Sequence, residues 1–586
     1  MHDEGQIGVI ASHKVLVIGD DTRSCLSTIR SLGRHGIEVH AAPFDFRAPA
    51  LTSRYVSKVH RLPHYSGDGT RWLKVMLRLL KRERFALVIA CDERSLLPLD
   101  RHREAVAQAT KLTVPSRATI DVLYDKHATR ELASQVGVPI APGRLLNADD
   151  TTNRLAEEFS LPVVIKPRRS YDMDRLHARA NVVVGHDCTE LDQALRRFEP
   201  GGAVVERYFP GCGTGLSVLA ADGHCLQAFQ HDRVHEAAEG GGSSYRISVP
   251  VNPALEAACT RMLGAIGYTG LAMFEFRRND ATGDWILLEV NARPWGSLPL
   301  AVAAGVDFPW LWYRLLVDGI QEPPSAYRLG LYGRNTQGDF HYLSRELDGR
   351  RGRPLDSAKV ALRYLAGYGR MLVGREANDT LVLDDPLPFI VELGQIIGGK
   401  LNVVGRKVPG GARRRRAGAE QAIERVLAAE KPRVTFVCHG NINRSPFAEG
   451  LLLTRRTELR RPFAVGSAGM LPLAGRRSPP GAQAAAAGYG VDLSAHRSIH
   501  LELENATGSS LLVVFDSDLR RAIERRFPGL DTPVIELGAL LDEPTEIADP
   551  DGRDQQFYQR CFALVSAGVE RMIAVLAAAE SGSRRC

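Results

Sequence analysis

The sequence predicts an α/β protein with several domains. Its 586 residues are too many for one hydrophobic core. From residue 14 onward, apolar strand-like runs alternate with segments of helical periodicity, and a second alternation of the same kind begins at residue 434. Changes in pattern and turn signals divide the chain into five expected segments: 1–115, 116–330, 331–404, 405–431 and 432–586.

The composition is that of an ordinary globular protein, with 44% hydrophobic and 24% charged residues and a net charge of +7. No apolar run reaches the ~18 residues that a membrane-spanning helix needs. The first twenty residues lack the basic start and apolar stretch of a signal peptide. The nine cysteines form no CxxC pair and no Cys/His cluster typical of a metal site. These features predict a cytoplasmic location, reduced thiols and no membrane span.

The segment 1–115 reads as a small parallel α/β layer. Its expected strands and helices alternate along the chain: strands 14–19, 37–42 and 86–91, and helices 24–36 and 72–84. Acids follow the first strand at Asp20 and Asp21 and the last at Asp92 and Glu93. Acids at such strand ends either line a ligand crevice or close the strand into a loop.

The segment 116–330 places charged residues in or at the ends of otherwise apolar strands. A helix is predicted from Lys126 to Gly137, and strands are predicted over 161–167, 202–209, 270–276 and 285–291. These strands carry Lys166, Glu206, Tyr208, Glu275, Glu289 and Asn291. Glu289 and Asn291 are two residues apart and therefore share one face of their strand. Two carboxylates and an amide on adjacent antiparallel strands make an all-oxygen site suited to Mg²⁺ held with nucleotide phosphates.

In this order, the polar residues resemble the pattern of the ATP-grasp superfamily over residues 14–330: Lys126, Lys166, Glu206, Glu275, Glu289, Asn291 and Arg293. The resemblance implies two α+β lobes beside the parallel layer. It implies that Lys126 and Lys166 contact the phosphates of ATP, and that the segment from Glu206 to Tyr208 meets the adenine and ribose. Glu275, Glu289 and Asn291 would hold Mg²⁺ (or Mn²⁺), and Arg293 would face the transferred phosphoryl group.

The reaction implied by the resemblance is ligation of a small-molecule carboxylate to an amine. One departure bears on it. Many ATP-grasp enzymes have a glycine-rich loop after the lysine-bearing strand, whereas residues 168–174 read RRSYDMD. A glycine loop occurs instead at 240–243, near Asp232, Arg233 and Glu236. The departure keeps open an alternative in which this unit is a non-catalytic nucleotide sensor.

The next two segments carry no catalytic pattern. Residues 331–404 have helical apolar spacing and are expected to form a helical appendage. Residues 405–431 contain glycines and four consecutive arginines, Arg413 to Arg416, and are expected to be a basic linker with a helix from Ala417. No aromatic residues interleave with the arginines, which disfavours a nucleic-acid partner.

The segment 432–586 opens with a strand that ends in Cys438, followed by the loop His439, Gly440, Asn441, Ile442 and Asn443 and a helix from Arg444. Backbone N–H groups converge on an anion where a strand passes through a tight loop into a helix. Cys438 at the base of such a loop is a candidate nucleophile. Arg444 can bind two phosphate oxygens through its planar guanidinium group, and Ser445 can donate to the sulfur. This arrangement suits attack on a phosphate ester with a phosphocysteine intermediate.

The loop resembles that of the low-molecular-weight protein tyrosine phosphatases, Cys-x-Gly-Asn-x-x-Arg-Ser-Pro. The resemblance covers residues 432–586 and includes the runs 466–469, 496–498 and 511–516 and the pair Asp549-Pro550. It implies a doubly wound α/β domain, with Asp549 as the general acid that protonates the leaving oxygen. Asp551 is a second carboxylate close by in the sequence.

Two differences from the family's patterns are informative. The second cysteine that often protects the nucleophile is absent, because Ile442 and Asn443 occupy that region, so we expect Cys438 to be more open to irreversible oxidation. Ile442 also replaces the threonine of the arginine-phosphatase branch, which favours phosphotyrosine. Arsenate reductases share the fold but need relay cysteines, and none occurs between Cys438 and Cys561.

The sequence therefore predicts a bifunctional enzyme that joins an ATP-grasp ligase-like unit to a tyrosine-phosphatase-like domain. The expected cofactors are ATP and Mg²⁺ (or Mn²⁺). The expected partners are a phosphotyrosine protein or small phosphate ester for one unit, and a small carboxylate and an amine for the other.

Overall fold

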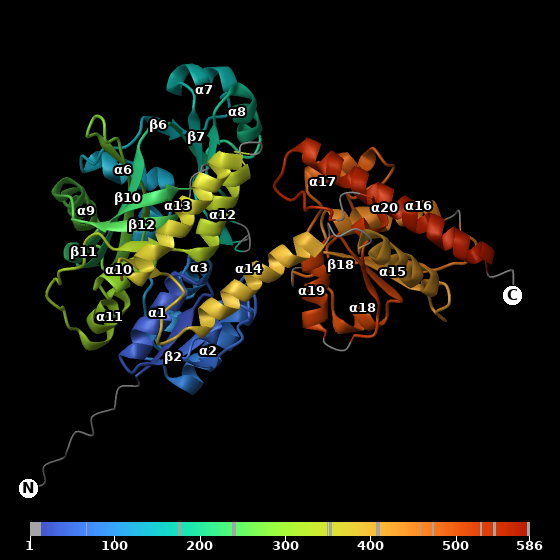
Figure 1. Cartoon of the computed structure of the whole chain (residues 1–586), viewed down its shortest axis with the longest axis horizontal. Helices are drawn as coiled ribbons and strands as arrows, with labels where there is room; N and C mark the ends of the chain where they lie inside the picture. Colours follow the sequence, from blue (N-terminus) through green and yellow to red (C-terminus); the bar gives the residue numbers. More distant parts are fainter. Residues whose placement is uncertain are drawn as a thin grey trace, which may run out of the picture. The chain divides into compact units, whose positions relative to one another are not determined.

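The computed structural model describes residues 13–582, apart from 66, 174–175, 177–178, 237–241, 349, 351–353, 406–410, 457–458, 472–473, 528–529 and 543–545. The chain divides into two compact units, residues 1–397 and 398–586 (Figure 1). The predicted class of α/β protein is confirmed, because each unit is built on sheets covered by helices.

Unit 1 begins with a parallel five-stranded sheet of order β3-β2-β1-β4-β5. The strands are β1 (Lys14–Ile18), β2 (Glu38–Ala42), β3 (Val56–Val59), β4 (Leu87–Ala90) and β5 (Lys111–Leu112). The helices that accompany them are α1 (Ser24–Arg34), α2 (Thr70–Glu83), α3 (Glu93–Arg101) and α4 (Arg103–Ala107). Strand residues alternate between two cores, so Val15 and Val17 pack toward α1 while Leu16 and Ile18 pack toward α2 and α3. The predicted parallel layer is therefore present.

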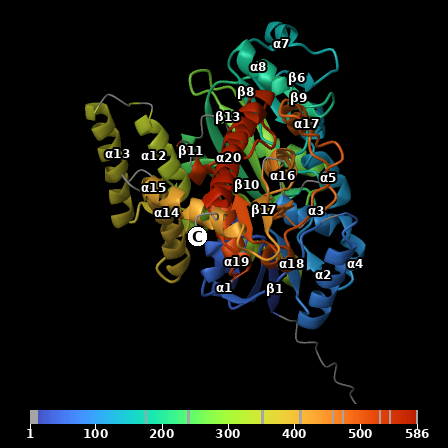
Figure 2. The same ribbon diagram turned by 90° about the vertical axis from the view of Figure 1, so that its right-hand side faces the viewer.

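A small antiparallel lobe follows. Its sheet has the order β6-β9-β7-β8, from β6 (Gly143–Leu145), β7 (Val163–Pro167), β8 (Val183–Gly185) and β9 (Ala203–Arg207). Helices α7 (Thr152–Phe159) and α8 (Cys188–Leu195) lie together over this lobe (Figures 1 and 2). Helices α5 (Arg117–Leu123) and α6 (Lys126–Gln135) precede it. Gly137, at φ +68°, ends the α6 segment where the sequence predicted a stop.

The large sheet of unit 1 has seven strands in the order β14-β13-β10-β11-β12-β15-β16. Five of them form an antiparallel block: β10 (Cys212–Ala221), β11 (His224–Glu236), β12 (Ser243–Val249), β13 (Gly270–Arg278) and β14 (Trp285–Asn291). Helix α9 (Pro253–Ala265) packs on it, and α10 (Leu298–Ala304) and α11 (Phe308–Tyr313) join it to the core around α1. Of the expected glycine loop, residues 240 and 241 lie outside the described residues, as does Asp174 of the arginine-containing segment.

The segment 331–404 is not purely helical. It contains α12 (Thr336–Asp348), α13 (Pro354–Leu372) and α14 (Leu387–Gly405), as its periodicity predicts. It also contributes β15 (Tyr332–Arg334) and β16 (Glu376–Asn378) to the large sheet. Arg334 of β15 pairs with Glu376 of β16 in a buried contact of 2.5 Å. Strands of three residues are too short for a period-2 pattern to reveal them.

Unit 2 is built on a parallel sheet of order β18-β17-β19-β20. The strands are β17 (Arg433–Cys438), β18 (Ala464–Gly469), β19 (Leu511–Val514) and β20 (Val534–Glu536). The helices are α16 (Arg444–Arg455), α17 (Pro480–Ala487), α18 (Leu503–Thr507), α19 (Ser517–Arg526) and α20 (Gln555–Gly582). The predicted doubly wound α/β domain is confirmed, since β18 and β19 flank β17 on opposite sides.

The residues expected to form a basic linker are largely helical. Helix α15 (Gly411–Val426) includes the four arginines and begins before Ala417. Its Ala419, Ile423 and Val426 are buried in the core of unit 2. The helix expected from Ala417 is therefore present but starts at Gly411, because the arginine run, which reads as a solvated hinge, forms its first turns. Its apolar residues recur at positions three and four apart and form a packing face.

Among the described residues, α20 is the one single helix long and apolar enough to cross a membrane. The bent pair 298–304 and 308–318 reaches that length only when its two parts are taken together. Phe562, Val565 and Val569 of α20 are fully buried in the core of unit 2. Packing against the sheet therefore accounts for the apolar composition of this helix.

Candidate functional sites in the two units

The position of Cys438 follows from the strand order of unit 2. β17 is the central strand from which the chain leaves to β18 on one side and later to β19 on the other. A crevice forms at the carboxyl end of a strand where the order reverses in this way. Cys438 is the last residue of β17, and α16 begins six residues later at Arg444. The fold thus places the thiol and a helix N-terminus at one crevice.

The sulfur of Cys438 is buried and accepts two hydrogen bonds. The backbone N–H of Asn441 donates to Sγ at 3.1 Å, and the hydroxyl of Ser445 donates to it at 3.0 Å. Cys438 is 1% exposed and Ser445 is fully buried. The two donors fix the sulfur at the base of the loop. The arrangement predicted for Cys438 and Ser445 is therefore present in the structure.

Asn441 organises the loop around this sulfur. Its backbone is left-handed, with φ +51°, and its side chain is fully buried. The amide donates to Ser445 Oγ at 2.9 Å and to Ser467 Oγ at 2.8 Å, and its oxygen accepts from the backbone N–H of Ile499 at 2.8 Å. Asparagine tolerates the left-handed region better than other side chains. These bonds hold the loop and orient the hydroxyl of Ser445 at the same time.

Arg444 joins the loop to the late carboxylate Asp549. Its NH2 donates to Asp549 Oδ2 at 2.6 Å, and its NH1 donates to Asp516 Oδ2 at 2.9 Å and to the carbonyl of Ile547 at 2.7 Å. The guanidinium group is 2% exposed, and its buried Nε has no hydrogen-bond partner among the described residues. A buried cation with an unused donor is suited to an anion.

Asn443 contacts both candidate acids. Its amide donates to Asp551 Oδ1 at 3.3 Å and to Asp549 Oδ1 at 3.5 Å. Only Asp549 also pairs with Arg444 among the described contacts, so the geometry favours Asp549 over Asp551 as the carboxylate that faces the loop. The remaining loop residues lie nearer the surface: His439 is exposed and Gly440 and Ile442 are half-buried. The carbonyl of Gly440 accepts a hydrogen bond from Arg476 at 2.5 Å.

In unit 1, the antiparallel register brings the predicted metal ligands together. Glu275 of β13 lies opposite Glu289 of β14, and Met273 lies opposite Asn291. The amide of Asn291 donates to Glu275 Oε1 at 3.2 Å and to Glu289 Oε1 at 3.4 Å. Arg233 donates to the other oxygen of Glu275. Two carboxylates and an amide thus share one face, and these are the oxygen donors that Mg²⁺ prefers.

The two carboxylates have different proton affinities. Burial and the neighbouring charge of Glu289 raise the pKa of Glu275, although Arg233 opposes the shift. Burial also disfavours ionisation of Glu289, but Lys126 and further basic neighbours outweigh it and hold the pKa of Glu289 below its usual value. A bound cation would favour ionisation of both groups.

The predicted lysines lie beside these acids. Lys126 Nζ is 4.0 Å from Glu289 Oε2 and donates to Ser170 Oγ at 3.0 Å. Lys166 is buried, forms an ion pair with Glu206 and donates to the carbonyl of Leu288 at 3.3 Å. The carboxylate of Glu206 also accepts from Arg130 at 2.8 Å, so Glu206 is held between two cations.

The other predicted residues of unit 1 lie as follows. Arg293 NH2 donates to Glu93 Oε1 at 3.2 Å, and the buried Arg293 Nε has no partner among the described residues. The hydroxyl of Tyr208 accepts from Arg277 at 3.2 Å. Arg168 donates to the buried helix cap Asp125 at 2.5 Å. Arg168, in the segment that lacks the expected glycines, is therefore bound to the N-cap residue of α6.

A cleft of about 520 Å³, measured out to solvent, opens beside these groups. Its polar lining residues are Glu93, Lys126, Thr129, Arg130, Ser170, Glu289 and Asn291. The cleft thus brings together Lys126, Glu289 and Asn291 of the predicted set. The other predicted residues do not line it in the described part of the chain: Lys166, Glu206, Tyr208, Glu275 and Arg293. Sequence reasoning missed Arg130 and Ser170, which belong to no local motif, while Glu93 had been noted only as an acid after a strand.

Comparison with known proteins identifies similar families for both units. Residues 433–581 match the family model described as low molecular weight phosphotyrosine protein phosphatase. Residues 202–332 match the model described as ATP-grasp in the biosynthetic pathway with Ter operon. Over 140 residues, the chain is 31% identical to a probable low molecular weight protein-tyrosine-phosphatase, EpsP, of Ralstonia nicotianae, covering 24% of this chain and 92% of that protein.

Unit 1 has more distant relatives. The chain is 23% identical to the D-aspartate ligase of Enterococcus faecium over 270 residues, which span 42% of this chain and 63% of the ligase. The crystal structure of an L-amino acid ligase from Bacillus licheniformis superposes with a TM-score of 0.41 at 20% identity, covering 53% of this chain and 77% of that one. The chain therefore spans less than two thirds of the length of the D-aspartate ligase that it matches.

The loop geometry yields a prediction for Asn441. Asn441→Ala should lower the free energy of unfolding of unit 2 by roughly 1–3 kcal/mol, because the buried groups that bond to its side chain lose their partner. Alanine is strained in the left-handed region, which should lower it by a further ~1–2 kcal/mol. Asn441→Gly removes the same hydrogen bonds without that strain and should be the more stable variant. Denaturant unfolding of the full chain, with wild type as reference, measures both. A wild-type transition in the alanine variant would contradict the role assigned to Asn441.

Proposed function

Unit 2 makes this chain a member of the low-molecular-weight protein tyrosine phosphatase family, with an ATP-grasp unit before it, and on that premise we propose that unit 2 hydrolyses phosphotyrosine through a phosphocysteine intermediate. The observation that supports this most directly is the pair of hydrogen bonds to Cys438 Sγ, from Asn441 N–H and Ser445 Oγ. These two donors and the N-terminus of α16 hold the sulfur at the base of the loop, in position to attack a phosphoryl group bound there.

In the proposed first step, the phosphoryl group of the ester enters the loop beside Arg444. The buried Nε of Arg444 and the loop N–H groups bind its oxygens. Cys438 Sγ attacks phosphorus, so an S–P bond forms while the P–O bond to the leaving group breaks. Asp549, in its protonated form, gives its proton to the leaving oxygen.

In the proposed second step, a water molecule attacks phosphorus and the S–P bond breaks. Asp549 takes the proton of that water, which regenerates its acid form, and Cys438 leaves as the thiolate that Asn441 and Ser445 stabilise. Inorganic phosphate is released. The proposed substrate is a phosphotyrosine protein or a small aryl phosphate, and Ile442 at the half-buried rim of the loop suits an aromatic leaving group.

The two neighbouring acids provide a matched test. Asp549→Asn should lower kcat by roughly 10²–10⁴-fold, the usual contribution of general acid catalysis. The decrease in kcat should be larger for phenyl phosphate than for p-nitrophenyl phosphate, because p-nitrophenolate is the better leaving group and needs less protonation. Asp551→Asn should keep kcat within a few-fold of wild type, because Asp551 contacts Asn443 but does not pair with Arg444 among the described contacts. Steady-state rates on both esters measure this, and a loss confined to Asp551→Asn would move the acid to that residue.

We further propose that unit 1 is a ligase that joins a carboxylate to an amine as ATP becomes ADP and phosphate. The cleft between Lys126 and the pair Glu289 and Asn291 supports this, because it sets a cation beside oxygen donors. Glu275, Glu289 and Asn291 would hold Mg²⁺ (or Mn²⁺), which would supply charge neutralisation for the phosphates of ATP. The D-aspartate ligase relative makes amino acids the first substrates to test.

The residues of unit 1 would act by position and charge. Lys126 and Lys166 would bind phosphate oxygens, and Arg293, held by Glu93 and with an unused Nε donor among the described residues, would face the transferred phosphoryl group. Tyr208 and Glu206, at the end of β9, would contact the nucleoside. The alternative is that unit 1 is a nucleotide sensor. One observation favours it: Arg168, where a glycine-rich loop would cover the phosphates, donates a hydrogen bond to Asp125 instead.

ADP release separates ligase from sensor. With Mg²⁺-ATP, an amino acid such as D-aspartate and an amine donor, wild type should release ADP in proportion to amide formed. Glu289→Gln should abolish this release, whereas Glu157→Gln, exposed on α7, should leave it unchanged. ATP binding without turnover across a panel of amino acids and amines would favour the sensor.

A further inference from the structure

A cluster of two histidines and a carboxylate lies in the parallel layer of unit 1, outside both sites described above. His40 belongs to β2, and His60 follows the edge strand β3 directly. In the register of the two strands His40 lies opposite Lys58, so His60, two residues further on, faces the same side of the sheet. The backbone N–H of His60 donates to the carbonyl of Ala41 at 2.8 Å, which continues the pairing. Helix α2 covers this face and ends at Glu83.

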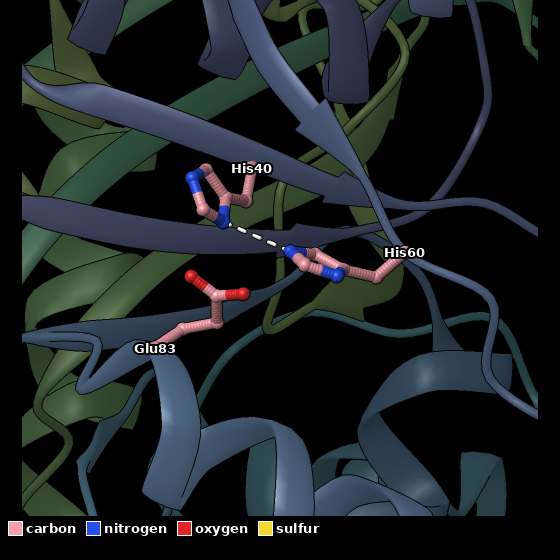
Figure 3. Close-up of side chains that lie close together, drawn as sticks. All are labelled: His40, His60 and Glu83. Atoms are coloured by element: carbon pink, nitrogen blue, oxygen red, sulfur yellow. Dashed lines mark hydrogen bonds between the residues drawn. The ribbon is translucent and has the colours of Figure 1, made fainter.

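The three side chains converge (Figure 3). His40 Nδ1 lies 2.9 Å from His60 Nε2, and one donor atom each of His40, His60 and Glu83 lies within 4.8 Å of the others. His40 is 1% exposed and His60 is 6% exposed. Buried imidazoles that approach this closely from separate strands, beside a carboxylate, have the donor set of a divalent transition-metal site.

Glu38 determines which nitrogen of His40 faces the cluster. Its Oε1 lies 2.7 Å from His40 Nε2. An ionised carboxylate only accepts hydrogen bonds, so Nε2 carries the proton and the lone pair of neutral His40 is on Nδ1, directed at His60. A metal-binding histidine generally donates its second ring N–H to a carboxylate or carbonyl in this manner. Glu38 therefore orients His40 for a ligand at the centre of the cluster.

Glu83 retains an oxygen for that ligand. Lys58 Nζ and Arg82 Nε both bind Oε1, at 2.8 Å and 3.1 Å, while Lys14 Nζ lies 4.0 Å from Oε2. Lys58 and Arg82 are 52% and 64% exposed, so solvent screens their charge from an ion bound at the buried imidazoles. On the other side, the ring of Phe85 meets the two imidazole rings edge-on, at centroid distances of 5.2 Å and 6.2 Å, and keeps water from the cluster.

We propose that His40 Nδ1, His60 Nε2 and the Glu83 carboxylate bind a divalent transition metal of the zinc type, with Glu38 as the positioning residue for His40. Binding requires the other neutral tautomer of His60: the ring gives up the proton on Nε2 and takes one up from solvent on Nδ1, so no net proton is lost, and the metal accepts the lone pairs of His60 Nε2 and His40 Nδ1. Because its ligands come from β2, the end of β3 and the end of α2, the ion stabilises the edge of the parallel sheet. This inference does not depend on the activity of either unit.

The test uses the full chain and Zn²⁺ itself. After stripping with a chelator and dialysis against Zn²⁺ at pH 7.5, metal analysis should find one more tightly bound equivalent in wild type than in His60→Ala or Glu83→Ala. His102→Ala is the matched control, because His102 bonds Tyr65 in the same layer and is not part of the cluster. It should retain the wild-type stoichiometry. Wild type and the variants share any zinc bound elsewhere, such as at Cys438, so the difference in stoichiometry between them reports on the cluster alone.

Thermal unfolding provides a second readout that detects folding defects. Without metal, circular dichroism should show Glu83→Ala folded, since Glu83 ends α2 and alanine suits a helix. Zinc at 100 times its Kd should raise the Tm of the parallel layer in wild type and His102→Ala by at least several degrees. It should not do so in Glu83→Ala. Equal zinc stoichiometry and equal Tm shifts in wild type and both cluster variants would overturn the proposal and leave a hydrogen-bonded histidine pair.

Discussion

The loop that follows β17 in unit 2 depends on one constraint, which is that hydrogen-bond donors point at the buried sulfur of Cys438. Cys438 satisfies it only because Asn441 adopts a left-handed backbone conformation, which directs its N–H at Sγ. The side chain of the same residue then holds Ser445, the second donor. The parallel sheet supplies the location, since β17 ends between β18 and β19. Cys438, the N-terminus of α16 and the Arg444–Asp549 pair meet there as a consequence of this topology.

In unit 1, two half-buried carboxylates are likewise surrounded by hydrogen-bond donors and cations. Glu275 and Glu289 face each other on paired strands, and like charges at this separation are unfavourable without compensation. The structure compensates with the amide of Asn291 between them and with Arg233 and Lys126 on either side. The differing pKa shifts of the two acids reflect this balance. The proposal that Glu275, Glu289 and Asn291 hold Mg²⁺ rests on this balance of charge.

Features that lie in contiguous sequence were predictable, and those assembled from distant segments were not. The phosphatase loop is one run of residues, so its strand, nucleophile and helix start were all visible, as were β13 and β14 with their acids. Arg130, Ser170 and the cluster of His40, His60 and Glu83 come from elements with no shared motif, and only the fold brings them together. The short strands β15 and β16 lack a detectable period. Helix α15 was expected only from Ala417, because the arginine run before it reads as a linker, and the packing of Ile423 in the core of unit 2 was not expected.

The most direct test of this account is to look for the covalent intermediate. Wild-type chain is mixed with p-nitrophenyl phosphate, quenched in acid during turnover, digested and analysed by mass spectrometry, with Cys438→Ser treated in parallel. The account predicts a phosphoryl group on Cys438 in the wild type. In Cys438→Ser it predicts no such adduct and no turnover. Turnover that leaves Cys438 unmodified, or that persists in Cys438→Ser, would contradict the proposed role of the loop.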